Sequence, residues 1–250
     1  IKITGEVGTG KTLLCRRFLA MQDPSCATAY IPNPQLEPRA LLLAIADELG
    51  RPLERDLESH LLQKELTATL LALAGEGRKV VVCIDEAQAM PLETLETLRL
   101  LTNLETEKRK LIQVVLFGQP ELDKHLADPR VRQLRQRITF QFNLGNLARD
   151  ELRNYLSHRL RVAGQPRASV FEDAAVRAIY RYTGGLPRLV NIIAHKAMIL
   201  AYGQGSEKVQ AWHVREAARD TPAARPGITR RMWLMALVVA SAGLAWVVLP

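Results

Sequence analysis

The chain has 250 residues and a formal net charge of +8, a length that allows one or two globular domains with a substantial core. Lysine and arginine are spread along the chain and aromatic residues make up only 5% of it, which argues against a stacking platform for single-stranded nucleic acid. The cysteines, Cys15, Cys26 and Cys83, are odd in number without a C-x-x-C pair, and the histidines lack metal-ligand spacing, so neither a disulfide framework nor a metal site built on histidine is expected.

A glycine-rich stretch near the start has the pattern G-x-x-x-x-G-K-T. A β-branched run at residues 1–4 precedes it, and the apolar spacing of a helix follows it. A strand, a glycine-rich turn and a helix in this order predict a loop whose backbone N–H groups converge on phosphate at a helix N-terminus. We therefore expect a nucleoside triphosphate to bind at Gly5, Glu6, Val7, Gly8, Thr9, Gly10, Lys11, Thr12 and Leu13.

Two side chains of this loop have specific expected roles. Lys11 is expected to reach the β- and γ-phosphates, and the Thr12 hydroxyl is expected to ligate Mg²⁺. Because Ile1 is not a methionine and already lies in the expected strand, the sequence is expected to be a piece of a longer chain.

Further strands and helices alternate after the loop. Apolar runs predict strands at residues 27–31, 80–84, 111–117 and 137–144, and helical spacing predicts helices at residues 39–49, 57–74 and 92–104. Strands that are apolar on both faces belong to a parallel sheet with helices on each side. The fold class expected for residues 1–147 is therefore α/β, a P-loop three-layer sandwich with a parallel sheet.

The second part of the chain contains helices only. Helical patterns at 150–163, 171–182, 187–202 and 211–219 predict an all-helical domain over residues 148–221, followed by a linker at 222–231. Residues 232–249 carry no charge, and 18 helical residues span about 27 Å, enough to cross a bilayer. We expect a transmembrane helix there. Arg230 and Arg231 would place the preceding domains in the cytoplasm.

The carboxylates that triphosphate chemistry needs follow an apolar strand. Asp85 is expected to hold Mg²⁺ together with Thr12, and Glu86 is expected to orient or deprotonate the attacking water. Gln119 ends the next central strand, where its amide could contact the γ-phosphate or the water. The alternative for Gln119 is that the sequence Gly-Gln-Pro only turns the chain.

Three arginines are candidates for stabilising charge in the transition state. Arg135 and Arg137 precede the fifth expected strand, and either one could project into the nucleotide of a neighbouring subunit. The alternative is a solvated cation at a helix end. Arg188 follows Gly-Gly-Leu-Pro at the start of a helix in the helical domain, from which it could fold back onto the γ-phosphate of its own site.

These segments together resemble the AAA+ ATPases, with GEVGTGKT as Walker A, VVVCIDEAQ as Walker B, GQPEL as the sensor 1 region, LRQRITF as the arginine-finger region and GGLPRLVN as the sensor 2 helix. Within that class the chain is similar to the general secretion pathway protein A (ExeA) type, and nearest to its MSHA pilus biogenesis (MshM) relatives. The resemblance covers roughly residues 1–221. It implies an oligomeric, Mg²⁺-dependent ATPase of the bacterial inner membrane that assists assembly of a type II secretion or type IV pilus machine, with envelope assembly proteins as partners.

Two other functions stay open. A DNA-associated AAA+ ATPase of the transposition-helper kind has a similar P-loop domain, and the charge of +8 supports it weakly, although the expected membrane span makes nucleic acid an unlikely partner. The second alternative is a nucleotide-gated scaffold that binds ATP with little turnover. A helicase is rejected, because residues 149–221 are helical and supply no second α/β domain.

Overall fold

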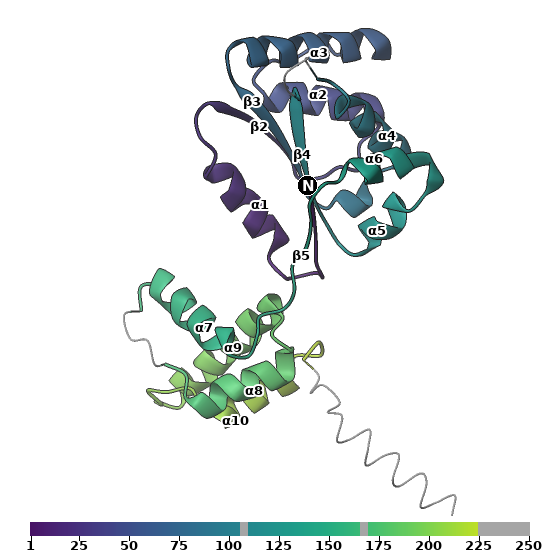
Figure 1. Ribbon diagram of the computed structural model, residues 1–250. Coiled ribbons are helices and arrows are strands. Elements are labelled where there is room, and N and C mark those ends of the chain that lie inside the picture. The colour runs from purple at the N-terminus through teal and green to yellow at the C-terminus, as the bar shows by residue number, and fades with distance from the viewer. Residues whose placement is uncertain (106–109, 166–169, 225–250) are drawn as a thin grey trace, which may run out of the picture. The chain divides into compact units, whose positions relative to one another are not determined.

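A computed structural model describes residues 1–105, 110–165 and 170–224 of the chain. The chain divides into two compact units, Ile1–Gly145 and a second unit that begins at Asn146 (Figure 1). Across the described residues, no helix combines the length and apolar character that a membrane crossing needs. The membrane helix expected at residues 232–249 lies outside the described part of the chain.

A parallel sheet forms the centre of the first unit. Its strands lie in the order β2-β3-β4-β1-β5, and every neighbouring pair is parallel. The strands are β1 (Lys2–Thr4), β2 (Cys26–Ile31), β3 (Lys79–Ile84), β4 (Ile112–Gly118) and β5 (Gln141–Asn143). Because all strands run the same way, the loops that follow them meet at one edge of the sheet, where α/β proteins bind ligands.

Helices cover both faces of the sheet (Figure 1). On one face α1 (Lys11–Ala20) packs its buried Cys15 against Cys83 of β3 and Phe117 of β4. The other face is covered by α2 (Pro38–Glu48), α3 (Ser59–Gly75) and α4 (Leu92–Leu101), whose leucines pack against the alternate residues of β2, β3 and β4. The three-layer α/β prediction is confirmed.

The fifth strand was predicted wrongly. Residues 137–144 were expected to be extended, but Arg137 is the last residue of a helix, α6 (Arg132–Arg137), and β5 contains only Gln141–Asn143. The strand is short because β1, its partner, pairs only over Lys2 to Thr4. Phe140 and Phe142 remain 58% and 59% exposed, so their alternation with polar residues reflects a sheet edge. Another short helix, α5 (Glu121–Leu126), was not predicted either.

The second unit is built from four helices among its described residues, in agreement with the predicted all-helical part. They are α7 (Glu151–Val162), α8 (Asp173–Thr183), α9 (Pro187–Gly203) and α10 (Ala211–Arg219). The turn into α9 requires a glycine at Gly185, because φ is +78° and a Cβ would lie 2.1 Å from the Leu147 carbonyl oxygen. This turn sets the start of α9, the helix that carries Arg188.

Charge is divided unequally between the two parts. Residues 1–145 contain 19 basic and 19 acidic side chains, whereas residues 146–250 contain 15 basic and 7 acidic ones. The entire net charge of +8 therefore belongs to the part of the chain that includes the helical unit.

Candidate nucleotide-binding site

The glycine-rich loop begins at the carboxyl edge of the sheet and is fixed there by both neighbouring strands. The Gly5 N–H donates to the carbonyl of Gly118 at the end of β4 (3.1 Å), and the Leu144 N–H, just after β5, donates to the carbonyl of Thr4 (2.7 Å). A Cβ on Gly5 would lie 2.6 Å from the Leu144 carbonyl oxygen. Glycine is therefore required at the first loop position by the close approach of the chain after β5.

Two further glycines allow the loop to turn into α1. Gly8 and Gly10 have φ of 88° and 98°, in the left-handed region that side chains disfavour. Between them the Thr9 hydroxyl donates to the Glu6 carbonyl (2.8 Å), which closes the turn. The loop thus leads directly into the N-terminus of α1, where free backbone N–H groups and the helix dipole favour an anion.

Lys11 is the first residue of α1, and its side chain folds back onto this loop. Its ammonium group donates to the carbonyls of Gly5 (2.7 Å) and Glu6 (3.0 Å), and the residue is only 5% exposed. An ammonium group has three N–H donors, so one remains beyond these two contacts. The positive charge is therefore held against the loop by two of its carbonyls.

The remaining loop positions differ in exposure. Glu6, Val7, Thr12 and Leu13 are exposed, so their side chains are accessible to a ligand. Val7 and Leu13 are 49% and 69% exposed.

The residues expected to hold magnesium offer oxygen donors. Asp85 follows β3 and is 2% exposed, and its Oδ1 accepts the Glu86 N–H at 2.9 Å. Together with the Thr12 hydroxyl this donor set fits Mg²⁺, which is held in such sites by one or two protein oxygens and by substrate phosphates. Within the described residues no cluster of three or more His, Cys, Asp or Glu side chains could hold a metal without a nucleotide.

Glu86 has an unusual backbone conformation. Its φ of 50° and ψ of 37° make it the one non-glycine residue with positive φ in the described chain. Such a conformation costs of order 1 kcal/mol and persists where the surroundings hold it. The turn after Glu86 supports this conformation, because the Ala89 N–H donates to the Glu86 carbonyl at 2.8 Å in the short 3-10 helix η1 (Ala87–Ala89).

Two amides hold the Glu86 carboxylate. Gln119 donates to Glu86 Oε2 at 3.1 Å, and Gln88 donates to the same oxygen at 2.6 Å. Gln88 was not among the predicted site residues. Its position two residues after Glu86 was the only sequence signal available, and the contact depends on the left-handed turn at Glu86. The structure therefore brings Glu86 and Gln119 together and adds Gln88 to them.

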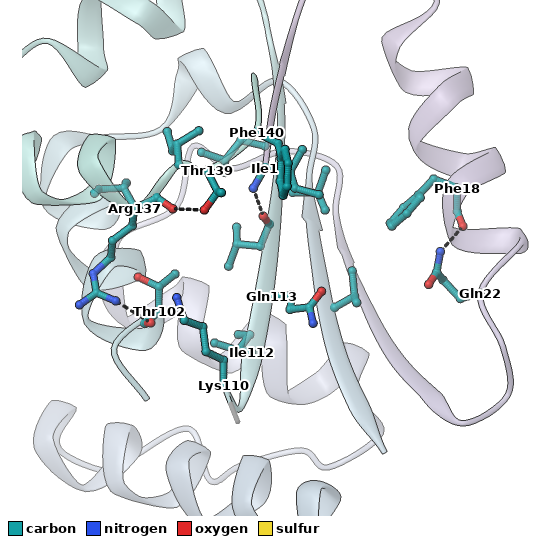
Figure 2. Close-up of a pocket in the computed structure, with 16 residues that line it drawn as sticks. Ile1, Phe18, Gln22, Thr102, Lys110, Ile112, Gln113, Arg137, Thr139 and Phe140 are labelled. Carbon is teal, nitrogen blue, oxygen red and sulfur yellow. Dashed lines mark hydrogen bonds between the residues drawn. The ribbon is translucent and has the colours of Figure 1, made fainter. Parts of the chain in front are cut away.

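The two expected arginine-finger candidates lie on α6, away from the loop. Figure 2 shows the Arg137 guanidinium beside Thr102, whose carbonyl accepts from Nη1 at 3.2 Å. Thr102 follows α4 and precedes β4, so this contact lies at the amino edge of the sheet, opposite the glycine-rich loop. The arginine lines a cavity of about 430 Å³ together with Ile1, Lys110, Ile112, Thr139 and Phe140. Arg135 is exposed.

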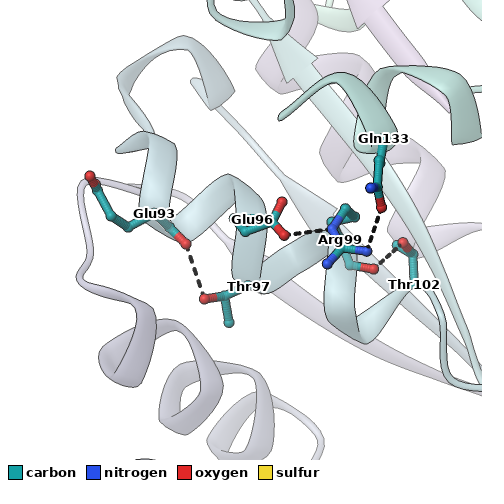
Figure 3. Close-up of polar contacts among 6 residues, drawn as sticks. All are labelled: Glu93, Glu96, Thr97, Arg99, Thr102 and Gln133. Carbon is teal, nitrogen blue, oxygen red and sulfur yellow. Dashed lines mark hydrogen bonds and ion pairs between the residues drawn. The ribbon is translucent and has the colours of Figure 1, made fainter. Parts of the chain in front are cut away.

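Polar contacts with α4 fix the position of α6. Figure 3 shows Arg99 of α4 between Glu96, which accepts from Nε at 2.7 Å, and Gln133 of α6, which accepts from Nη1 at 2.9 Å. Leu134 of α6 is buried in the same core as α4. The helix that carries Arg135 and Arg137 is therefore held against α4 within the first unit.

Arg188 is exposed and lies in the first turn of α9, in the second unit. Its expected contact with a γ-phosphate bound in the first unit stays a prediction. Within its own unit, the turn before α9 is tied by the Leu147 N–H, which donates to the Gly185 carbonyl at 3.0 Å.

The chain is similar in sequence to known proteins. The sequence profile of a family described as an AAA domain matches residues 1–126. General secretion pathway protein A from Aeromonas hydrophila is 43% identical over 245 residues. That alignment covers 97% of this chain and 44% of the relative, so the chain spans less than half of the relative's length. The expected likeness to the general secretion pathway protein A type is confirmed, whereas this match does not distinguish the MSHA pilus branch.

Solved structures from two archaeal sources have a similar fold. The ORC2 protein of Aeropyrum pernix, solved in ADPNP–ADP complexes, has a TM-score of 0.65 at 22% identity, covering 90% of this chain and 62% of its own. Cdc6p from Pyrobaculum aerophilum has a TM-score of 0.66 at 20% identity, covering 88% and 60%. At these identities the likeness concerns the fold alone.

Proposed function

The chain belongs to the AAA domain family, and we propose that it is a membrane-anchored ATPase that binds and hydrolyses ATP with Mg²⁺ to assist assembly of a secretion or type IV pilus machine. The observation that carries the ATPase proposal is the hydrogen-bonded connection between the loop and the carboxylate. The Gly5 N–H donates to the carbonyl of Gly118, the last residue of β4. Gln119, which follows Gly118, donates from its side chain to Glu86. The phosphate loop and the candidate base are thus held at one edge of the sheet.

Each site residue has a separate role in this proposal. Lys11 and the N–H groups before α1 bind the triphosphate, and Thr12 and Asp85 hold the metal ion. Bound Mg²⁺ would neutralise charge on the phosphate oxygens. Glu86 accepts the proton of the attacking water, and Gln119 orients either that water or the carboxylate. Arg188 acts on its own site, whereas Arg137, or Arg135 as the alternative, acts on the site of a neighbouring subunit in a homo-oligomer.

Removal of the lysine ammonium tests nucleotide binding. Lys11→Ala is expected to raise the Kd for ATP by about 10- to 100-fold, because a hydrogen bond to a charged group is worth about 1.5–3 kcal/mol. Titration with a fluorescent ATP analogue measures this change. Lys64→Ala, which removes a lysine of α3 outside the site, is the matched control. Wild-type affinity in Lys11→Ala would contradict the phosphate-loop assignment.

The secretion role and the inner-membrane location rest on the relative and on the uncharged run at residues 232–249. Arg225, Arg230 and Arg231, which come shortly before this run, support this location. Basic residues next to a span remain in the cytoplasm and are attracted to anionic lipid, so the ATPase unit would face the cytoplasm. The partners that follow are envelope proteins of the secretion or pilus machine.

Membrane anchoring is tested by two changes to the chain. Removal of residues 230–250 is expected to transfer the protein from the membrane pellet to the soluble fraction. The pair Val238→Asp and Gly243→Asp should do the same, because each aspartate costs about 3 kcal/mol near the centre of a spanning helix. Fractionation of cell lysates measures both. A full chain that stays soluble without detergent would refute anchoring, and salt-dependent binding to duplex DNA would then favour the DNA-associated alternative.

A further inference from the structure

Gln88 makes contacts at both ends of its side chain. Its Nε2 donates to Glu86 Oε2 at 2.6 Å, and its Oε1 accepts from the backbone N–H of Gln119 at 2.9 Å. The Gln119 side chain returns to Glu86 Oε2 at 3.1 Å. These three bonds form a closed ring that joins the turn after β3 to the turn after β4.

Neighbouring residues leave space for the Gln88 side chain and anchor the turn that carries it. A Cβ on Gly118 would lie 3.2 Å from Gln88 Oε1 and 2.9 Å from the Leu122 side chain, so a glycine leaves the space that the amide occupies. On the other side of η1, Met90 is 1% exposed and anchors the turn in the core. Gln88 is therefore held on a fixed turn and is not a freely rotating surface side chain.

The two oxygens of the Glu86 carboxylate have different hydrogen-bond contacts in this ring. Both amide donors reach Oε2, and no donor from the described residues reaches Oε1. A carboxylate held in this way has one oxygen fixed by neutral donors and the other available to accept a proton. Gln88 and Gln119 together fix Oε2, and the shorter of the two hydrogen bonds comes from Gln88.

We propose that Gln88 is a positioning residue for ATP hydrolysis, acting through Glu86 and Gln119. This inference rests on the proposed ATPase function. In the step it serves, the water oxygen bonds to the γ-phosphorus and the bond from that phosphorus to the β,γ-bridging oxygen breaks, releasing ADP. The proton of the water passes to Oε1 of Glu86, while Gln88 and Gln119 hold Oε2.

The decisive variant is Gln88→Glu, which keeps an acceptor for the Gln119 N–H but replaces the donor to Glu86 by a second carboxylate. We expect kcat to fall about 10- to 100-fold with KM for ATP unchanged, because the base is misplaced while the phosphate loop is intact. Hydrogen exchange at the Gln119 N–H should stay slow in Gln88→Glu, because the glutamate still offers that N–H an acceptor.

Two further variants separate positioning from stability. Gln88→Leu should lower kcat about tenfold with KM for ATP unchanged, and it should speed hydrogen exchange at the Gln119 N–H, which loses its acceptor. Gln113→Glu places the same charge change on an exposed position of β4 and should leave kcat unchanged.

The outcomes distinguish the two proposals. If the wild-type chain hydrolyses ATP and either Gln88→Glu or Gln88→Leu keeps the wild-type kcat, the role of Gln88 alone is overturned. A wild-type chain that binds ATP but does not hydrolyse it would overturn the ATPase proposal, and the role of Gln88 with it.

Discussion

Replacement of Glu86 by glutamine is expected to leave ATP binding close to wild type and to lower the hydrolysis rate by about 10²- to 10⁴-fold. The amide has nearly the size and shape of the carboxylate, so the turn after β3 should persist. It cannot accept a proton from water at neutral pH, so the chemical step loses its base. Phosphate release at saturating ATP measures the rate, and titration with a fluorescent analogue measures binding in the same samples.

The matched control for this prediction is Glu93→Gln. Glu93 is an exposed glutamate in the first turn of α4, and its backbone carbonyl accepts a hydrogen bond from the Thr97 hydroxyl (Figure 3). The same substitution there should change neither binding nor rate. If Glu86→Gln hydrolyses ATP at the wild-type rate, the base lies elsewhere and the closed ring around Oε2 has only a structural role.

The central elements could be predicted because each is determined by its own sequence. β3 and β4 are buried on both faces, so their continuous apolar runs identify them as central strands of a parallel sheet. The phosphate loop is equally local, because its glycines, its lysine and the start of α1 are consecutive in the chain. For these parts, neighbouring residues alone define the geometry.

The parts that were missed depend on residues that are distant in sequence. β5 is an edge strand whose length is limited by β1, about 140 residues earlier, so its own alternating pattern overestimated it. Gln88 contacts Gln119 only because β3 and β4 end side by side and Glu86 adopts a left-handed turn. Neither condition is visible in the residues around position 88.

The second large expected effect concerns Arg137. Arg137→Ala is expected to bind ATP normally and to hydrolyse it about 10³-fold more slowly, because an arginine supplied by a neighbouring subunit stabilises transition-state charge to this extent. We propose that Arg137 acts on another subunit's site because, within one chain, it lies away from the phosphate loop. The Arg137 guanidinium contacts the Thr102 carbonyl at the amino edge of the sheet, whereas the phosphate loop lies at the carboxyl edge.

Arg137 ends α6, four residues before the start of β5 at Gln141, and not at the start of a strand as expected, but it still lies at the amino edge of the sheet. Phe140, three residues after Arg137, lies at the same edge, because its carbonyl accepts from the N–H of Lys2, the first residue of β1. The bond to Thr102 is a single contact with a neutral carbonyl, which a phosphate oxygen would replace by a stronger charge-assisted one. Arg132→Ala, at the other end of the same helix, is the control and should retain full activity.

Mixing experiments distinguish action on a neighbour from action within one chain. Subunits with Lys11→Ala cannot bind ATP well but carry an intact Arg137, so an excess of them should restore part of the activity of Arg137→Ala subunits. The wild-type rate per subunit should also rise with protein concentration as the oligomer forms, because each site needs its neighbour's arginine. Arg135→Ala tests the alternative residue in the same assay. A rate independent of concentration, together with a fully active Arg135→Ala/Arg137→Ala double variant, would show that a single chain completes its own site.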